Sequence, residues 1–316
     1  MKHLLTIAAA SLIAGSALAQ YPAKPIRIVV PFPGGSATDT ITRILGQSIS
    51  PAVGQPIVVD NKPGADGAIA GAEIAKATPD GYTLFMATNS PMSAVPALKK
   101  VPPYDPVADF TPITDIGRYT FFLYVNASVP AKTFQELIAY AKANPGKLAY
   151  ATGNTTGIVS FAQMNALAGI DMLHVPYKGE PQGITDLVGG RVQVMWATPT
   201  TGLPHVKDGK LRALVTQLTK RSHLLPDVPT IHEAGMPKFT ITSWAALFGP
   251  AKMPRDIVER VNKEFVAAMG RAEVQAQMEK QAFLMSPSTP EKLGAFVKEQ
   301  MDSYRTILRA AGVQPE

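Results

Sequence analysis

Short apolar runs rich in β-branched and aromatic residues alternate with amphipathic helical patterns along most of this chain. Runs such as "IRIVV" (26–30), "PIVVD" (56–60) and "YTLFMA" (82–87) are nearly continuous apolar segments, which is typical of strands covered by helices on both faces. Strands that alternate with helical patterns indicate βαβ units around a parallel sheet. The sequence therefore predicts an α/β fold.

The same pattern continues through the middle of the chain and then becomes helical. Further strands are predicted at 121–125, 147–151, 171–175, 191–197, 210–215 and 245–249, and helices at 39–52, 67–77, 133–144, 157–168, 181–188 and 201–208. In the last third, "MPRDIVERVNKEFVAAMG" and "TPEKLGAFVKEQMDSYRTILRAAG" each start near a proline and end at a glycine. Those are helix start and stop signals, so we expect two more helices there.

The N-terminus has the pattern of an exported protein. Lys2 precedes an apolar stretch, which ends at Ala17-Leu18-Ala19, and this order predicts a signal peptide over residues 1–19, cleaved before Gln20. A membrane anchor is the alternative, but the apolar run is shorter than the ~20 residues that a span needs. The chain has no cysteine, which suits an oxidising compartment and excludes thiol chemistry. We therefore expect a periplasmic protein.

The mature chain is long enough for two domains. Removal of the predicted signal peptide leaves 297 of 316 residues, and a domain has roughly 150 residues as a soft prior. No Gly/Ser-rich or Pro-rich linker divides the chain, so we expect it to cross between domains through ordered segments near 118–121 and 240–244. This predicts a discontinuous domain 1 (20–119 plus 242–316) and a domain 2 (120–241).

Charge and composition narrow the classes of function. The net charge is +6, but the basic residues are spread out, and the densest group, "LTKRSH" (218–223), has no interleaved aromatics. Nucleic-acid binding usually needs a concentrated patch, so we predict none. A mild positive field suits the capture of small acids.

Motifs of known catalytic or cofactor sites are missing from the sequence. There is no Gly-x-Ser-x-Gly, His-Glu-x-x-His, Gly-x-Gly-x-x-Gly or Walker loop, and these are the patterns that carry such chemistry. His174, His205, His223 and His232 show no metal-ligand spacing, and His174 lies in an apolar run as a core histidine would. We therefore predict no catalytic residue, metal or cofactor. An exported α/β hydrolase or lyase acting on a small acid in the same cleft is the alternative.

The turn after the first strand is the best candidate for a ligand site. In "PFPGGSATDTITRIL" (31–45), Gly34 and Gly35 allow backbone N–H groups to turn toward an anion at the positive end of a helix. Ser36 and Thr38 add hydroxyl donors, and Asp39 is an N-cap or first-turn residue. The alternative is a tight turn without a ligand.

Three other strand-to-helix turns have the same character. They are "MATNSPMS" (86–93), "YATGNTTG" (150–157) and "WATPTTG" (196–202), and all are rich in hydroxyl and amide groups and poor in charge. Ligands of open α/β sheets bind beyond the carboxyl ends of the strands. Four such turns therefore predict a site that binds its ligand by hydrogen bonds.

Several segments together identify a resemblance. They are "PIRIVVPFPGGSATDTITRIL", "NKPGADGAIAGAEIAKATPDGYTL", "YDPVADFTPI", "GKLAYAT", "HVPYKG", "DLVGGRVQV", "LPHVKDGKLRAL" and "LPDVPTIHEAG". With these segments the chain resembles the Bug/TctC family, the extracytoplasmic solute-binding proteins of tripartite tricarboxylate transporters. The resemblance runs from about Tyr21 to the C-terminus. It implies a two-domain periplasmic-binding-protein (type II, Venus-flytrap) fold, each domain a sheet flanked by helices. It also implies a monomeric, non-enzymatic receptor that delivers an organic carboxylate to the membrane components of a transporter.

The resemblance also implies a set of ligand contacts. In the first domain these are Phe32, Gly35, Ser36, Ala37, Thr88, Asn89 and Ser90, and in the second domain Asn154, Thr155, Thr156, Tyr177, Thr198 and Thr200. Asp186, in "DLVGG", is either a ligand contact or a helix cap. Where many relatives have a Gly-Ser-x-x-His-Leu-like helix start, this chain has Ile158, Val159 and Ala162. This more apolar wall favours an aromatic acid over aspartate or citrate, with a dicarboxylate as the other candidate.

Overall fold

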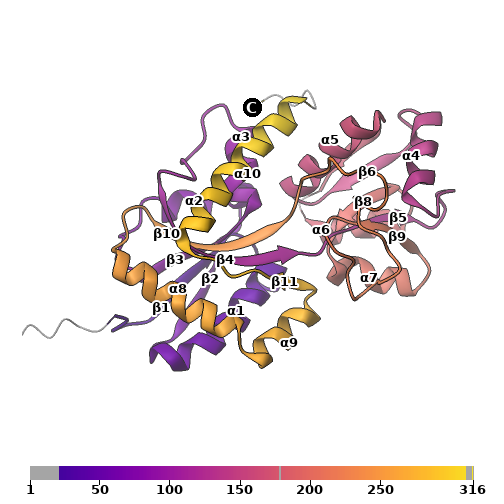
Figure 1. Cartoon of the computed structure of the whole chain (residues 1–316). Coiled ribbons are helices and arrows are strands. Elements are labelled where there is room, and N and C mark those ends of the chain that lie inside the picture. The colour runs from indigo at the N-terminus through magenta and orange to yellow at the C-terminus, as the bar shows by residue number, and fades with distance from the viewer. Residues whose placement is uncertain (1–20, 178, 311–314, 316) are drawn as a thin grey trace, which may run out of the picture.

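Two β-sheets, each flanked by helices, lie side by side in the computed structural model (Figure 1). The structure describes residues 21–177, 179–310 and 315. The predicted signal peptide lies outside these residues. Over the described ranges, no helix is both long and apolar enough to cross a membrane. The arrangement confirms the predicted α/β class with two sheets.

The first sheet has six strands and mixes directions. It contains β1 (Ile26–Val30), β2 (Ile57–Asn61), β3 (Thr83–Thr88), β4 (Phe110–Tyr119), β10 (Trp244–Pro250) and β11 (Phe283–Met285), in the order β11-β4-β10-β3-β1-β2. Strand β1 is parallel to β2 and β3, whereas β10 is antiparallel to β3 and β4. The associated helices are α1 (Ala37–Val53), α2 (Ala68–Ile74), α3 (Val95–Leu98), α8 (Arg255–Met269), α9 (Ala272–Lys280) and α10 (Pro290–Ala310), with the short turns η1 (Ala65–Gly67) and η2 (Ser90–Ala94).

The second sheet has five strands. It contains β5 (Phe122–Asn126), β6 (Ala149–Thr152), β7 (Leu173–Pro176), β8 (Val194–Ala197) and β9 (Leu211–Thr216), in the order β7-β6-β8-β5-β9. Its helices are α4 (Phe134–Ala143), α5 (Thr155–Ala168), α6 (Glu180–Val188) and α7 (Pro199–Lys207). Strand β6 is parallel to β7 and β8, and β5 is antiparallel to β8 and β9. Both sheets are therefore mixed rather than purely parallel.

The chain passes between the sheets at two places. Strand β4 ends in the first sheet at Tyr119 and β5 begins in the second at Phe122, while the chain leaves β9 at Thr216 and re-enters the first sheet at Trp244. Strand β4 carries the chain out and β10 carries it back, so the two pair antiparallel. The domain limits 119/120 and 241/242 stay a prediction, because the residues between 216 and 244 belong to no strand or helix.

Each predicted strand and helix forms within three residues of its expected bounds. The elements that were not predicted are β4, β11, α9 and the short α3, η1 and η2. Strand β4 was missed because its sequence, "FTPITDIGRY", contains a proline, a glycine and two charges. Both carboxylate oxygens of Asp115 accept from Arg118 at 2.8 Å, and this pairing lets the charges lie in the sheet. Strand β11 has only three residues, and α9 is polar apart from the buried Val274 and Met278.

The core extends from one sheet to the other. One cluster of buried apolar residues joins β1 and β3 of the first sheet to β5 and β8 of the second, and includes Trp196 and Tyr304. Smaller clusters fill the other face of each sheet. Burial of one large apolar side chain contributes about 1.5–3 kcal/mol. Helix α10 contacts α5 as well as β4, so the C-terminal helix ties the two halves together (Figure 1).

Substitution of Gly117 tests the pairing of β4 with β11. Its φ is +154°, and an added Cβ would lie 2.1 Å from the carbonyl oxygen of Leu284 in β11. Gly117→Ala should therefore lower the free energy of unfolding by about 2 kcal/mol or more, as measured by urea denaturation. Gly294→Ala is the control, since its nearest neighbour would be 3.5 Å away within α10, and it should change stability by no more than ~1 kcal/mol. Equal stability of the two variants would contradict the pairing.

Candidate functional site

The turn between β1 and α1 is held by its own side chains. Gly35 adopts φ +80°, and its N–H donates to Asp39 Oδ2 at 2.9 Å. Ser36 is the N-cap of α1, and its Oγ accepts from the Asp39 N–H at 3.2 Å. The expectation that the Gly35 N–H faces a ligand is therefore not met in this structure, because Asp39 accepts it.

Asp39 is a buried, ionised carboxylate behind that turn. Its side chain is 5% exposed and pairs with Arg43 at 2.9 Å, and Asn61 donates to it at 3.0 Å. Burial alone would raise the pKa of Asp39, but the hydrogen bonds from Arg43, Gly35 and Asn61 hold it below its usual value. The charge of Asp39 is thus neutralised within the turn.

The first turn of α1 keeps donors for a ligand. The N–H groups of Ala37 and Thr38 have no acceptor among the described residues, and the Ser36 hydroxyl retains its own proton to donate. Unpaired N–H groups at a helix N-terminus attract anions. Phe32 is half-buried beside this turn, and its carbonyl accepts from Asn61 at 3.0 Å. The N–H groups of Ala37 and Thr38, rather than that of Gly35, are therefore the ones without an acceptor among the described residues.

Two of the other predicted turns meet directly. Asn89 Nδ2 donates to Thr156 Oγ1 at 2.6 Å, and Thr155 Oγ1 donates to Ser90 Oγ at 2.8 Å. Asn89 and Ser90 follow β3 of the first sheet, whereas Thr155 and Thr156 begin α5 beside the second. We call these four residues the interdomain bridge. All four are almost fully buried, as is Thr88, whose Oγ1 accepts from the Ser90 N–H at 3.3 Å.

The Asn89 amide has no capacity left for a ligand. Besides Thr156, its Nδ2 donates to Tyr304 at 2.9 Å, and its Oδ1 accepts from Ser243 Oγ at 3.2 Å and from the Trp244 N–H at 3.3 Å. Two donated and two accepted bonds satisfy the amide fully. Tyr304 and Ser243 were missed from sequence, because a tyrosine on an apolar helix face is indistinguishable from ordinary packing.

The remaining second-domain turns converge on Glu180, which was also missed. Glu180 Oε2 accepts from the Thr198 N–H, Thr198 Oγ1 and Thr201 Oγ1 at 3.0, 2.8 and 3.1 Å, and its Oε1 accepts from Asn154 Nδ2 at 3.3 Å. Burial raises the pKa of Glu180 above its usual value, and the hydrogen bonds from Thr198, Thr201 and Asn154 offset only part of this increase. Thr200 is exposed on α7. The sequence did offer one signal for Glu180: an acidic residue directly before the predicted helix 181–188 lies where a helix N-terminus stabilises a carboxylate.

Tyr177 and Asp186 are paired with each other. The Tyr177 hydroxyl donates to Asp186 Oδ2 at 2.8 Å, and Arg191 contacts the other oxygen at 2.5 Å. The hydrogen bond from Tyr177, with Arg191, holds the pKa of Asp186 below its usual value. Asp186 lies inside α6 and not at its first turn, so it does not cap that helix. Its role toward a ligand stays a prediction.

The apolar wall is smaller than expected. Val159 lies in the core with 0% exposure, whereas Ile158 and Ala162 keep part of their surface. His174 has a hydrogen-bond partner but is only half-buried, in the edge strand β7: its Nε2 lies 2.7 Å from Thr152 Oγ1, and its ring stacks on Tyr150. The expected core position of His174 was therefore wrong. Throughout the ranges that the structure describes, no group of three His, Cys, Asp or Glu side chains is placed to hold a metal ion.

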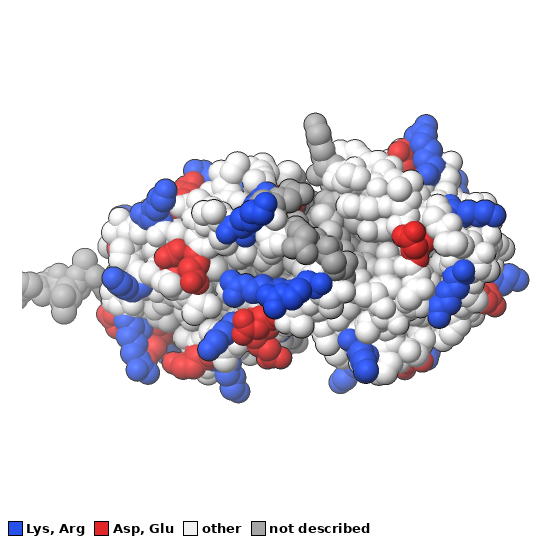
Figure 2. Space-filling model, turned by 90° about the horizontal axis from the view of Figure 1, so that it is seen from above, with Lys and Arg blue, Asp and Glu red and all other residues white. Residues whose placement is uncertain are grey.

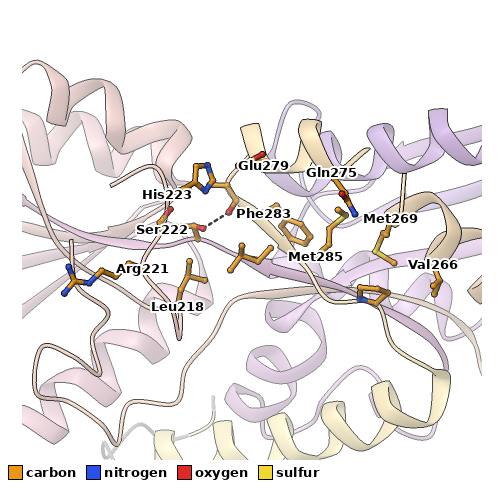
Figure 3. Close-up of a pocket in the computed structure, with 15 residues that line it drawn as sticks. Leu218, Arg221, Ser222, His223, Val266, Met269, Gln275, Glu279, Phe283 and Met285 are labelled. Carbon is orange, nitrogen blue, oxygen red and sulfur yellow. Dashed lines mark hydrogen bonds between the residues drawn. The ribbon is translucent and has the colours of Figure 1, made fainter. Parts of the chain in front are cut away.

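A separate pocket of about 640 Å³ lies away from all of these turns (Figure 3). Its lining is mostly apolar and comes from the segment after β9, with Leu218 and His223, and from α8, α9 and β11, with Met269, Phe283 and Met285. None of the predicted site residues lines it. On the face shown in Figure 2, basic and acidic side chains are interspersed over both halves of the molecule.

Fold and site together define a class. The molecule has two mixed β-sheets flanked by helices, the chain passes between them twice, and the turns at their strand ends meet. This is the architecture of a two-domain periplasmic binding protein. A family model described as the tripartite tricarboxylate transporter family receptor matches residues 41–313. The chain belongs to this family, whose members are periplasmic receptors and not enzymes.

Individual relatives agree with this assignment. The Bordetella pertussis protein BugT is 32% identical over 314 residues, which cover 98% of this chain and 95% of BugT. A structure described as a periplasmic transporter is 37% identical, with a TM-score of 0.84 over 93% of this chain and 99% of its own. Rpa4515 of R. palustris, solved with adipate, is 30% identical, with a TM-score of 0.86 over 94% of this chain and 100% of its own.

The interdomain bridge can be tested by removing its hydroxyls. Thr155→Val leaves the Ser90 hydroxyl without its buried donor, and Thr156→Val removes one of the two acceptors of Asn89 Nδ2. Each variant should therefore lower the free energy of unfolding by about 1–3 kcal/mol. Small-angle scattering should show a larger radius of gyration for the double variant. Thr185→Val is the matched control, because that exposed hydroxyl bonds only within α6. If all three single variants are equally stable, the bridge does not hold the domains together.

Proposed function

We propose that this protein captures a small organic carboxylate between its two domains and delivers it to the membrane components of a tripartite transporter. The proposal draws on the family membership and on the adipate carried by the similar Rpa4515. The observation that carries it is the interdomain bridge, which brings the strand-end turns of both sheets into contact. Residues 20–119 with 242–316 would form one domain and 120–241 the other, after export by a signal peptide over residues 1–19.

The ligand carboxylate binds at the first turn of α1 in this proposal. The N–H groups of Ala37 and Thr38 and the hydroxyl of Ser36 donate to it, with Phe32 and Gly35 shaping the turn. The dipole of the 17-residue helix α1 adds to the attraction. Tyr177, Asp186, Thr198 and Thr200 remain the second-domain candidates. Ile158 and Ala162 leave room for an aromatic acid as well as for a dicarboxylate.

Closure of the two domains links capture to delivery. A ligand closes such a protein only by the extra affinity that it has for the closed state. The bridge bonds of Asn89 and Ser90 add to that state without contacting the ligand, since they run from one domain to the other. The closed form is then the form that the membrane partner recognises, and a monomer suffices for this cycle.

Screening a library of carboxylic acids by thermal shift tests the binding function. A true ligand should raise the melting temperature, bind one to one in calorimetry and be recovered unchanged. Ligand at 100 times its Kd should add about 2.7 kcal/mol to the free energy of unfolding. Turnover of the acid would instead support the exported hydrolase or lyase. Loss of uptake after gene deletion tests delivery to the transporter.

Ser36→Ala tests the assigned carboxylate position. It removes one hydroxyl donor and should weaken binding of the identified acid by ~1 kcal/mol, about fivefold. Because Ser36 is also a helix cap, the variant should lose stability too. Thr133→Ala is the matched control: Thr133 caps α4 in the same way but lies outside the candidate site. It should lose a similar amount of stability and no affinity. Equal affinity of the two variants would contradict the assignment.

A further inference from the structure

The second half of the proposed cleft already contains an acidic group, the carboxyl side chain of Glu180. Its Oε2 accepts three hydrogen bonds, two from Thr198 and one from Thr201, at 2.8–3.1 Å. Its Oε1 accepts from Asn154 at 3.3 Å. All four bonds come from uncharged donors, and among the described residues none makes an ion pair with Glu180.

Three helix N-termini converge on this carboxylate. Asn154 is the N-cap of α5, Thr198 is the N-cap of α7, and Glu180 is itself the first residue of α6. Each helix start carries a partial positive charge that stabilises an anion in its first turn. The position at which this domain would best hold a ligand carboxylate is therefore filled by a side chain of the protein.

Glu180 lies next to the interdomain bridge. Asn154, which donates to it, immediately precedes Thr155 and Thr156, and these bond across to Ser90 and Asn89. The turn at Gly153 packs closely against the start of α6, where an added Cβ would lie 2.4 Å from the Glu180 nitrogen. Glu180 is half-buried as a residue. Its place at the strand-end turns makes it part of the cleft wall.

The two halves of the cleft therefore differ in what they offer. In the first turn, Arg43 neutralises Asp39, and the N–H groups of Ala37 and Thr38 are available to an anion. In the second half, Asn154, Thr198 and Thr201 already donate to Glu180. A second ligand carboxylate would meet a like charge there, and like charges brought together in a partly desolvated site oppose binding.

Glu180 can instead accept a hydrogen bond from a ligand. Oε1 receives one long bond, whereas Oε2 receives three, and a carboxylate oxygen has more than one acceptor position. A hydrogen bond that involves a charged acceptor is about twice as strong as a neutral one. A ligand group with an N–H or O–H would therefore be favoured at Oε1.

We propose that Glu180 makes this receptor selective for monocarboxylates whose far end carries a hydrogen-bond donor, an ammonium or a hydroxyl group, and selective against dicarboxylates. The carboxylate of such a ligand binds the first turn of α1 and its donor faces Glu180 Oε1. This inference rests on the proposed function and specifies its substrate class. It separates this chain from Rpa4515, whose ligand adipate carries a carboxylate at each end.

Matched acids that differ only at the far end provide the test. One series compares adipate, 6-aminohexanoate and 6-hydroxyhexanoate, a second compares succinate, 4-aminobutyrate and 4-hydroxybutyrate, and a third compares terephthalate, 4-(aminomethyl)benzoate and 4-hydroxybenzoate. Titration calorimetry of the mature protein should show at least tenfold tighter binding of an amino or hydroxy acid than of the dicarboxylate in the series that fits the cleft.

Glu180→Gln should reverse this preference. The amide keeps an oxygen toward Thr198 and turns its NH2 toward the ligand, so the dicarboxylate should gain at least tenfold in affinity while the amino acid loses affinity. If the glutamine variant does not fold, Glu180→Ser replaces it, with its melting temperature as the check of folding. Glu180→Ser should bind the dicarboxylate and its amino and hydroxy analogues with similar affinity. Glu273→Gln is the control, because it makes the same change of net charge at an exposed position of α9.

The outcomes separate this inference from the proposed function. If no acid of any series binds, the carboxylate receptor itself is contradicted. If the dicarboxylate binds as tightly as its amino and hydroxy analogues, or if Glu180→Gln leaves their ratio as it is in Glu273→Gln, the receptor stands and the role of Glu180 is wrong.

Discussion

The hydrogen bonds of the Asn89 side chain are the interaction on which the arrangement of the two domains depends. One buried amide contacts α5 through Thr156, the C-terminal helix through Tyr304 and the returning strand β10 through Trp244. A buried amide that lost one of these partners would be left unsatisfied, at a cost of about 1–3 kcal/mol. The domain junction is therefore a specific polar contact surrounded by a continuous apolar core, and its geometry is determined more closely than by apolar packing alone.

Two internal carboxylates then give the cleft its polarity. Asp39 lies behind the first turn, where Arg43 and the Gly35 N–H compensate its charge. Glu180 is held by the donors of the second domain. The first acid positions a turn and leaves the N–H groups of Ala37 and Thr38 available, whereas the second takes up the donors around it. The same chemical group thus prepares one half of the cleft for an anion and the other half for a donor.

Local pattern was sufficient for most of the fold. Apolar runs and turn residues identified the strands and helices that follow the βα repeat, because each is specified by its own short sequence. Strand β4 was not predicted, because its proline, glycine and charges are unfavourable in a strand unless specific contacts accommodate them. Asp115 pairs with Arg118, and Gly117 makes room for the backbone of β11. The Asp115–Arg118 pair lies within residues 110–119, but the β11 backbone at Leu284 does not, and no reading of residues 110–119 alone could have supplied it.

The sequence by itself determined the α/β class, the four donor-rich turns and the resemblance to a receptor family, because all of these depend on residues close together in the chain. Only the tertiary structure decided which donors are already used. Asn89 meets Tyr304 across 215 positions, and Thr198 meets Glu180 across 18. Whether a hydroxyl or amide is free for a ligand depends on such distant partners, because a hydrogen bond that is made within the protein is no longer available to anything else.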